Sequence, residues 1–122
     1  MTRRTRPLFF PPIMKKPVDL VELKPVTRRV TALMSDRDWA AFSLRLALDP
    51  TAGDLIPGTG GWRKVRLADP ASNKGKSGGF RVITFFHAPH RVYVGAIYPK
   101  GVQTKLTPAQ KAQLKKITES LD

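Results

Sequence analysis

Three segments rich in Val, Ile, Phe and Tyr follow one another closely in the second half of the chain, and they limit its fold more than any other feature. They cover residues 62–68, 80–86 and 91–98. This composition is typical of β-strands. Only residues 87–90 separate the second segment from the third, and a parallel pair needs a far longer connection. The sequence therefore predicts an antiparallel hairpin.

A helix is predicted over residues 36–48. Ser35 precedes it as an N-cap, and the two acids of the first turn favour a helix N-terminus. The apolar positions Trp39, Phe42 and Leu46 follow helical spacing, so they would form one buried stripe. Asp49-Pro50 ends the segment, because the residue before a proline is disfavoured in the helical region.

The C-terminal segment carries an equally clear helix signal. Thr107 is a candidate N-cap, Pro108 fits the first helical position, and Gln110 completes a capping box. The positions Leu114, Ile117 and Leu121 lie on one face. Before Ser35, residues 18–23 suit a short strand and residues 26–34 one or two helical turns.

These segments predict an α+β fold with a small, mainly antiparallel sheet of about four strands. Two helices lie in the N-terminal half and one at the C-terminus, and we expect all of them to pack against one face of the sheet. Residues 1–17 form a basic, proline-rich stretch that is typical of a disordered tail. Residues 18–122 then form one domain, because 122 residues with 41% apolar content suit a single core.

The charge is strongly positive. Lys and Arg total 22 against 9 Asp and Glu, a formal charge of +13, and no acid occurs from Pro70 to Thr118. Cations without neighbouring acids favour a polyanionic partner, since each one that neutralises a phosphate releases counterions. Nucleic acid is such a partner, although an acidic protein or an anionic membrane surface would satisfy the same argument.

Several classes of site are excluded or disfavoured. The chain has no cysteine, so a disulfide framework, a thiolate nucleophile and a cysteine zinc site are impossible. His87 and His90 lie in the predicted hairpin turn without nearby carboxylates, and we expect neither a metal nor a cofactor. No apolar run is long enough to span a bilayer. The expected location is the cytoplasm.

The predicted strands place several cations together. Alternation along residues 62–68 turns Val65 and Leu67 to the core and Lys64 and Arg66 outward. Arg81 lies on the next strand, and the loop between them carries further lysines but no acid beyond Asp69. Tyr98 ends the third strand, where an aromatic ring could stack on a base or serve in acid–base chemistry, and Tyr93 should point to the opposite face.

Four stretches, taken together, resemble the HigB-type toxins of the RelE/ParE superfamily: Gly53–Arg66, Gly75–Ile83, Ala96–Lys100 and Leu106–Gln110. The resemblance implies the RelE-like toxin fold and a toxin of a type II toxin-antitoxin system that cuts mRNA on the translating ribosome. It also implies a cognate acidic antitoxin, often of the helix-turn-helix type. Operator DNA would then be reached only through the toxin–antitoxin complex.

Metal-independent cleavage by Lys, Arg and Tyr is the expected chemistry. The catalytic residues expected from the resemblance are Lys74, Lys76, Arg81, Tyr98 and Lys100. Expected RNA contacts are Arg63, Lys64, Arg66 and, from the acid-free stretch, Arg91. The patch of these expected site residues includes no carboxylate or histidine. A lysine with a pKa lowered by its neighbours would therefore be the general base.

Two other functions stay open, and one departure from the family bears on the second of them. Relatives commonly carry Gly-Lys-Asn-Glu where this chain has Pro99–Val102, so polar groups after the last strand are missing. A ParE-like inhibitor of DNA gyrase would share the fold without needing a basic cleft. A non-catalytic RNA- or ribosome-binding module would keep the cleft without cleavage.

Overall fold

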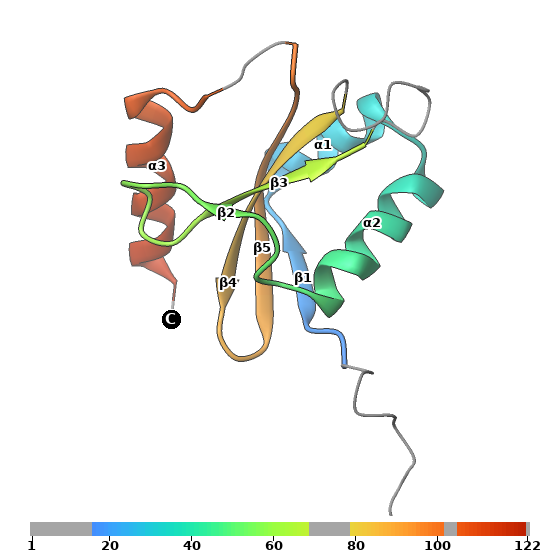
Figure 1. Cartoon of the computed structure of the whole chain (residues 1–122), viewed down its shortest axis with the longest axis horizontal. Coiled ribbons are helices and arrows are strands. Elements are labelled where there is room, and N and C mark those ends of the chain that lie inside the picture. The colour runs from blue at the N-terminus through green and yellow to red at the C-terminus, as the bar shows by residue number, and fades with distance from the viewer. Residues whose placement is uncertain (1–15, 69–78, 102–104, 122) are drawn as a thin grey trace, which may run out of the picture.

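The computed structural model describes residues 16–68, 79–101 and 105–121. Most of the predicted tail, and the loop that carries Lys74 and Lys76, lie outside these residues. The elements are β1 (Asp19–Glu22), α1 (Lys24–Leu33), α2 (Asp36–Leu48), β2 (Asp54–Leu55), β3 (Arg63–Leu67), β4 (Phe80–His87), β5 (Arg91–Pro99) and α3 (Pro108–Ser120) (Figure 1). None of the helices among these residues is long and apolar enough to cross a membrane.

The strands form one sheet in the order β1-β5-β4-β3-β2. β1 pairs with β5 in parallel, and the other pairs are antiparallel. The α+β class and the mainly antiparallel sheet are therefore confirmed. The sheet has five strands instead of about four, because Asp54 and Leu55 form a two-residue strand within the expected connector. A strand this short leaves no periodic pattern in the sequence.

α1 and α2 cover one face of the sheet. The predicted stripe Trp39, Phe42 and Leu46 is buried there. The strands contribute buried aliphatic residues such as Val82 and Val94 to the same core. The Trp39 indole Nε1 also donates to Glu22 Oε2 at 2.8 Å, which ties α2 to β1.

α3 covers the opposite face, so the expectation that all helices pack on one face is wrong. Figure 1 shows α3 and the pair α1 and α2 on different sides of the sheet. The second core contains Trp62, Ile83 and Leu114, with Ile117 packed against it. The physical reason is that both faces of β4 are buried along most of its length, so each face needs a cover.

A β-bulge changes the alternation along β5. Val94 pairs with Thr84 and Ala96 pairs with Ile83, so Gly95 is the extra residue. Tyr93 and Tyr98 therefore lie on the same face, and the prediction that they point to opposite faces is wrong. Gly95 also lies under the Trp62 ring, because a Cβ atom there would come within 2.6 Å of Trp62 Cζ3.

Both predicted helix starts are confirmed. The Ser35 hydroxyl accepts a hydrogen bond from the Asp38 N–H at 3.1 Å. The Thr107 hydroxyl accepts from the Gln110 N–H, and the Gln110 side chain accepts from the Thr107 N–H, which is the complete capping box. These bonds satisfy N–H groups that have no partner within a helix.

Candidate functional site

Three of the predicted site residues form a row across the sheet. Arg66 pairs with Arg81 across β3 and β4, and Arg81 pairs with Tyr98 across β4 and β5. Paired positions in antiparallel strands direct their side chains to the same face, with Cβ atoms about 4.5–5.5 Å apart. This row, Arg66–Arg81–Tyr98, lies on the face that carries α3. Two cations and a phenol are thus neighbours.

Arg81 is the most buried cation of the row. Only 6% of its surface is exposed. Its Nη1 donates to the Phe80 carbonyl oxygen at 3.3 Å, and the described residues give it no carboxylate partner. Buried charges in proteins are usually paired, because removing them from water is costly. A buried guanidinium without a carboxylate is therefore suited to bind an anion from outside the chain.

Tyr98 is buried beside Arg81. Only 5% of its surface is exposed, and its hydroxyl has no hydrogen-bond partner among the described residues. Burial raises the pKa of Tyr98, and the positive charge of Arg81 lowers it to a smaller extent. The phenol therefore keeps its proton at neutral pH. It is available as a hydrogen-bond donor or a proton donor, and not as a base.

Replacing Tyr98 by Phe should separate stability from activity. The described residues offer the buried hydroxyl no hydrogen-bond partner, so its removal should leave the free energy of unfolding unchanged or raise it by up to about 1 kcal/mol. If the chain cleaves RNA, as the resemblance implies, and the hydroxyl donates a proton in that cleavage, the rate should fall by about 100-fold or more. Urea denaturation and a cleavage assay on the same preparations measure the two effects. A clear loss of stability would contradict the first expectation.

At alkaline pH, the wild-type protein and Tyr98→Phe should differ in how much stability they lose. The pKa of Tyr98 is higher in the folded protein than in the unfolded chain, so the proton favours the folded state. The contribution of this proton to the free energy of unfolding is fully present below a pH of about 10, the ordinary pKa of tyrosine. It is lost as the pH rises through the higher pKa of Tyr98 in the folded protein. The wild-type protein should lose more stability there than Tyr98→Phe, as urea denaturation at pH 8 and pH 11 would show.

Lys64 lies on the same face as Arg66, two positions earlier on β3, and is half-buried. Its antiparallel partner on β2 is Asp54. The expectation that the patch contains no carboxylate is therefore wrong at this edge of the sheet. The sequence separates Asp54 from Lys64 by a glycine-rich loop, and only the pairing of β2 with β3 brings the two positions together.

Lys100 lies at the end of β5 and close to the row. Its backbone N–H donates to the Gly79 carbonyl oxygen at 3.0 Å, which continues the pairing of β5 with β4 beyond Pro99. The side chain is half-buried. The described structure thus places Lys64, Arg66, Arg81, Tyr98 and Lys100 in one region, while the predicted Lys74 and Lys76 fall outside the described residues.

Two predicted RNA contacts lie elsewhere. Arg63 pairs with Thr84, so it is on the opposite face of the sheet, and its Nη1 donates to the Gly53 carbonyl oxygen at 3.0 Å. Arg91 begins β5 at the hairpin end, where its Nη1 contacts the Tyr93 hydroxyl at 3.4 Å. At about 3.3 Å per residue, roughly 20 Å of strand separate Arg91 from Tyr98.

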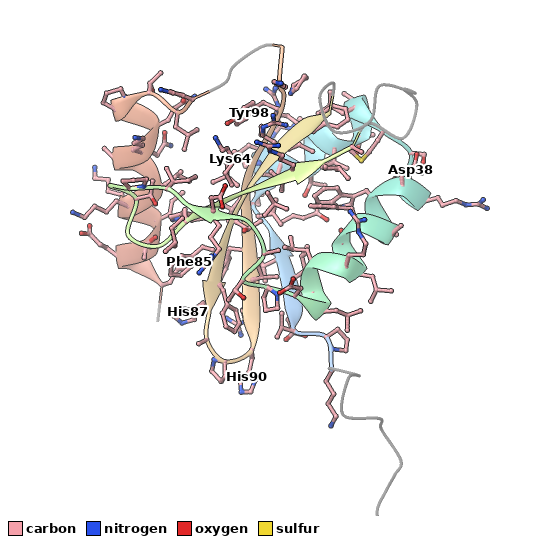
Figure 2. The ribbon with its side chains drawn as sticks, in the orientation of Figure 1. Asp38, Lys64, Phe85, His87, His90 and Tyr98 are labelled. Atoms are coloured by element: carbon pink, nitrogen blue, oxygen red, sulfur yellow. The ribbon has the colours of Figure 1, made fainter. Side chains whose placement is uncertain are left out.

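The two histidines also lie at the hairpin end. Figure 2 shows His87 and His90 at one end of the sheet and Lys64 and Tyr98 toward the other. His87 is the last residue of β4, and its ring lies 6.2 Å from the Phe85 ring and 6.3 Å from the Tyr93 ring, between centroids. Within the described residues, no group of three metal-ligating side chains comes together.

Comparison with known proteins supports the fold assignment. No family model matches the sequence. The structure is similar to a solved structure of the Escherichia coli toxin RelE, a mutant in the free state, with a TM-score of 0.54. The match covers 87% of this chain and 100% of that one, at 13% sequence identity. Identity this low assigns no residue roles, but the coverage is nearly complete, and the chain therefore has the RelE-like toxin fold.

Proposed function

We propose that the chain is the toxin of a type II toxin-antitoxin system and an mRNA endonuclease that acts on the ribosome, of the HigB type. The RelE-like fold and the HigB-type sequence stretches support this assignment. The observation that carries it is the buried Arg81 guanidinium, which has no carboxylate partner among the described residues and lies beside the protonated phenol of Tyr98. This pair suits a phosphodiester.

The reaction that fits these groups uses the RNA's own 2′-hydroxyl. A base removes its proton, the oxygen attacks the adjacent phosphorus, and the bond from phosphorus to the 5′-oxygen breaks. The leaving 5′-oxygen takes a proton from an acid. The products are a 2′,3′-cyclic phosphate and a 5′-hydroxyl. Cations lower the barrier because negative charge accumulates on the phosphate oxygens in the transition state.

The described residues suit distinct parts of this reaction. Arg66 and Arg81 would hold the phosphate, since guanidinium groups bind two oxygens at once and stay charged. Tyr98 keeps its proton and would donate it toward the leaving oxygen, or its ring would position a nucleobase of the RNA. Lys74 or Lys76 would serve as the general base, and Lys100 would support the leaving group. No step requires a metal ion.

The ribosome would supply what this acid–base set lacks. A lysine base and a tyrosine acid of raised pKa are both poorly matched to neutral pH, so catalysis depends on holding the RNA in line for attack. The partners of the proposed toxin are mRNA, the ribosome and an acidic antitoxin that neutralises the +13 charge. Operator DNA would be bound through the antitoxin, and the toxin would act in the cytoplasm.

Induction of the chain in a bacterial host tests the proposal. We expect growth arrest with mRNA fragments that map to translated regions, and rescue when a neighbouring reading frame for a short acidic protein is induced as well. DNA damage without mRNA fragments would instead identify a gyrase inhibitor. Ribosome binding without fragments would identify a non-catalytic module, and either result would reject the nuclease.

A further inference from the structure

A hollow of about 240 Å³ lies between the β2 edge of the sheet and the start of α3. Residues from three separate parts of the chain line it: Asp54, Leu55, Ile56, Pro57, Lys64, Tyr98, Lys105, Leu106 and Lys111. Neither the row nor the predicted site includes Lys105, Lys111 or Asp54. Tyr98 belongs to both the row and the hollow, so the two are continuous.

Lysines dominate the charge of the hollow. Lys64 comes from β3, Lys105 precedes α3, and Lys111 lies in its first turns. Asp54 is the one acid among the described lining residues, whose formal charge is therefore +2, three positive charges minus one. A concave surface with this charge favours an anion, and lysine ammonium groups bind phosphate as mobile point charges.

The rest of the lining is apolar. Leu55, Ile56, Pro57 and Leu106 contribute side chains without charge. Leu55 is unusual for a large apolar residue because 60% of its surface is exposed. An apolar wall beside a cluster of cations suits a nucleotide, because the aliphatic side chains can contact the face of a base while the cations bind its phosphate.

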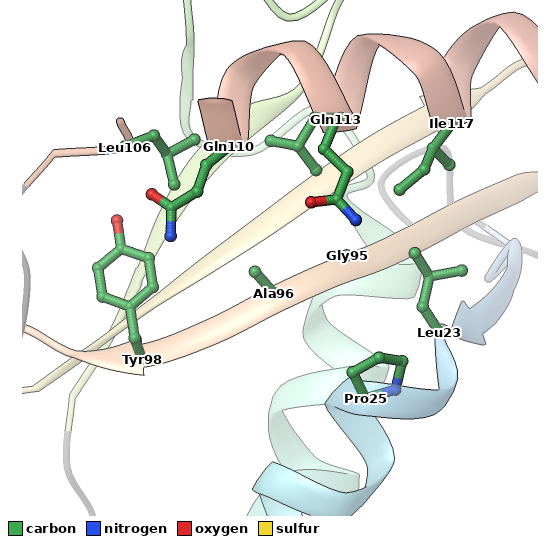
Figure 3. Close-up of a pocket in the computed structure, with 10 residues that line it drawn as sticks. Leu23, Pro25, Gly95, Ala96, Tyr98, Leu106, Gln110, Gln113 and Ile117 are labelled. Carbon is green, nitrogen blue, oxygen red and sulfur yellow. The ribbon is translucent and has the colours of Figure 1, made fainter. Parts of the chain in front are cut away.

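The Tyr98 hydroxyl gives an independent sign of a ligand. Figure 3 shows a neighbouring pocket that shares Tyr98 and Leu106 with the hollow. The Tyr98 ring rises from β5 there, and its hydroxyl is directed toward Leu106 and Gln110 at the start of α3. This hydroxyl is buried and has no hydrogen-bond partner among the described residues. Buried polar groups are nearly always satisfied, so an external group that reaches this hydroxyl, at the boundary between the pocket and the hollow, would gain a hydrogen bond.

We propose that the hollow is a nucleotide subsite for single-stranded RNA, next to the linkage held by the row. Lys64, Lys105 and Lys111 bind the phosphate, the apolar wall takes the base, and the Asp54 carboxylate accepts from the exocyclic amino group of a base that carries one, as cytosine does. Uracil carries an oxygen at that position, which the carboxylate repels. The subsite rests on the proposed function, because that function supplies RNA as the substrate.

Binding by the whole chain to short single-stranded RNA tests the phosphate contact. Lys111→Gln should weaken the affinity for a ten-nucleotide RNA by about fivefold, and should make the dependence of log affinity on log salt shallower by about 0.7. Lys116→Gln is the matched control, since it removes the same charge from an exposed position on the same helix outside the hollow. Equal affinities for the two variants would overturn the subsite.

The base contact needs its own measurement. The wild-type chain should bind oligocytidine more tightly than oligouridine, and Asp54→Asn should reduce this preference. An unchanged preference would overturn the role of Asp54. Neither assay involves cleavage, so the two proposals can fail separately. If Lys111→Gln binds RNA like wild type while the wild-type chain still cuts mRNA, the subsite is wrong and the nuclease stands. If Lys111→Gln binds RNA more weakly but the wild-type chain yields no mRNA fragments on the ribosome, the subsite stands and the nuclease is wrong.

Discussion

Replacing Arg81 by Ala should lower the rate of mRNA cleavage on the ribosome by about 100- to 1,000-fold, the usual cost of removing one group that stabilises transition-state charge. Arg81 lies at the centre of the row, between Arg66 and Tyr98. Its guanidinium has no carboxylate partner among the described residues, so the phosphate would be its main anionic partner. Growth arrest on induction should disappear with the activity.

Two further variants make this result interpretable. Arg81 is buried, so Arg81→Ala also leaves a cavity, whereas Arg81→Lys keeps a cation but loses bidentate binding and should have intermediate activity. Arg37→Ala removes an exposed arginine from α2, on the opposite face of the sheet, and should cleave like wild type. Thermal unfolding identifies any variant that is not folded. Cleavage by folded Arg81→Ala within about twofold of wild type would refute its assignment.

Trp62→Ala should lower the free energy of unfolding by about 3–5 kcal/mol, a large part of the total for a domain of this size. The Trp62 side chain has 0% exposure and lies between the sheet and α3. Its indole N–H donates to the Leu114 carbonyl oxygen at 3.0 Å and to the Thr118 hydroxyl at 2.7 Å. The variant therefore loses both the packing and the polar attachment of α3.

Trp62→Phe separates these two contributions. It keeps an aromatic ring but removes the indole donor, so it should cost less than Trp62→Ala. Urea denaturation followed by far-UV circular dichroism measures both variants. A loss below about 1 kcal/mol for Trp62→Ala would mean that α3 is attached by other contacts. Because α3 forms one wall of the hollow, Trp62→Ala should also weaken RNA binding.

Local chemistry accounts for what was predictable in the fold. The N-caps Ser35 and Thr107, the stripe on α2 and the hairpin strands all depend on neighbours within a few residues, and the structure confirms them. The bulge at Gly95 was not predictable, because a glycine inside an apolar strand gives no sign of whether it pairs or bulges. This one residue reversed the expected direction of Tyr98 relative to Tyr93.

The candidate site shows the same division. Lys64, Arg66 and Arg81 could be grouped from strand alternation and from the expectation that two successive strands are neighbours in the sheet. Asp54 and Lys111 reach the same hollow only through β2 pairing and through the packing of α3, which are long-range features. The acid-free stretch already contained Lys105 and Lys111, but charge alone could not distinguish them from solvated surface lysines.

Analysis of the RNA ends produced on translating ribosomes tests the central claim most directly. The row should yield an upstream fragment with a 2′,3′-cyclic phosphate and a downstream fragment with a 5′-hydroxyl, and Arg81→Ala should yield neither. Fragments that carry a 5′-phosphate, or cyclic-phosphate fragments formed equally well by Arg81→Ala, would contradict the account.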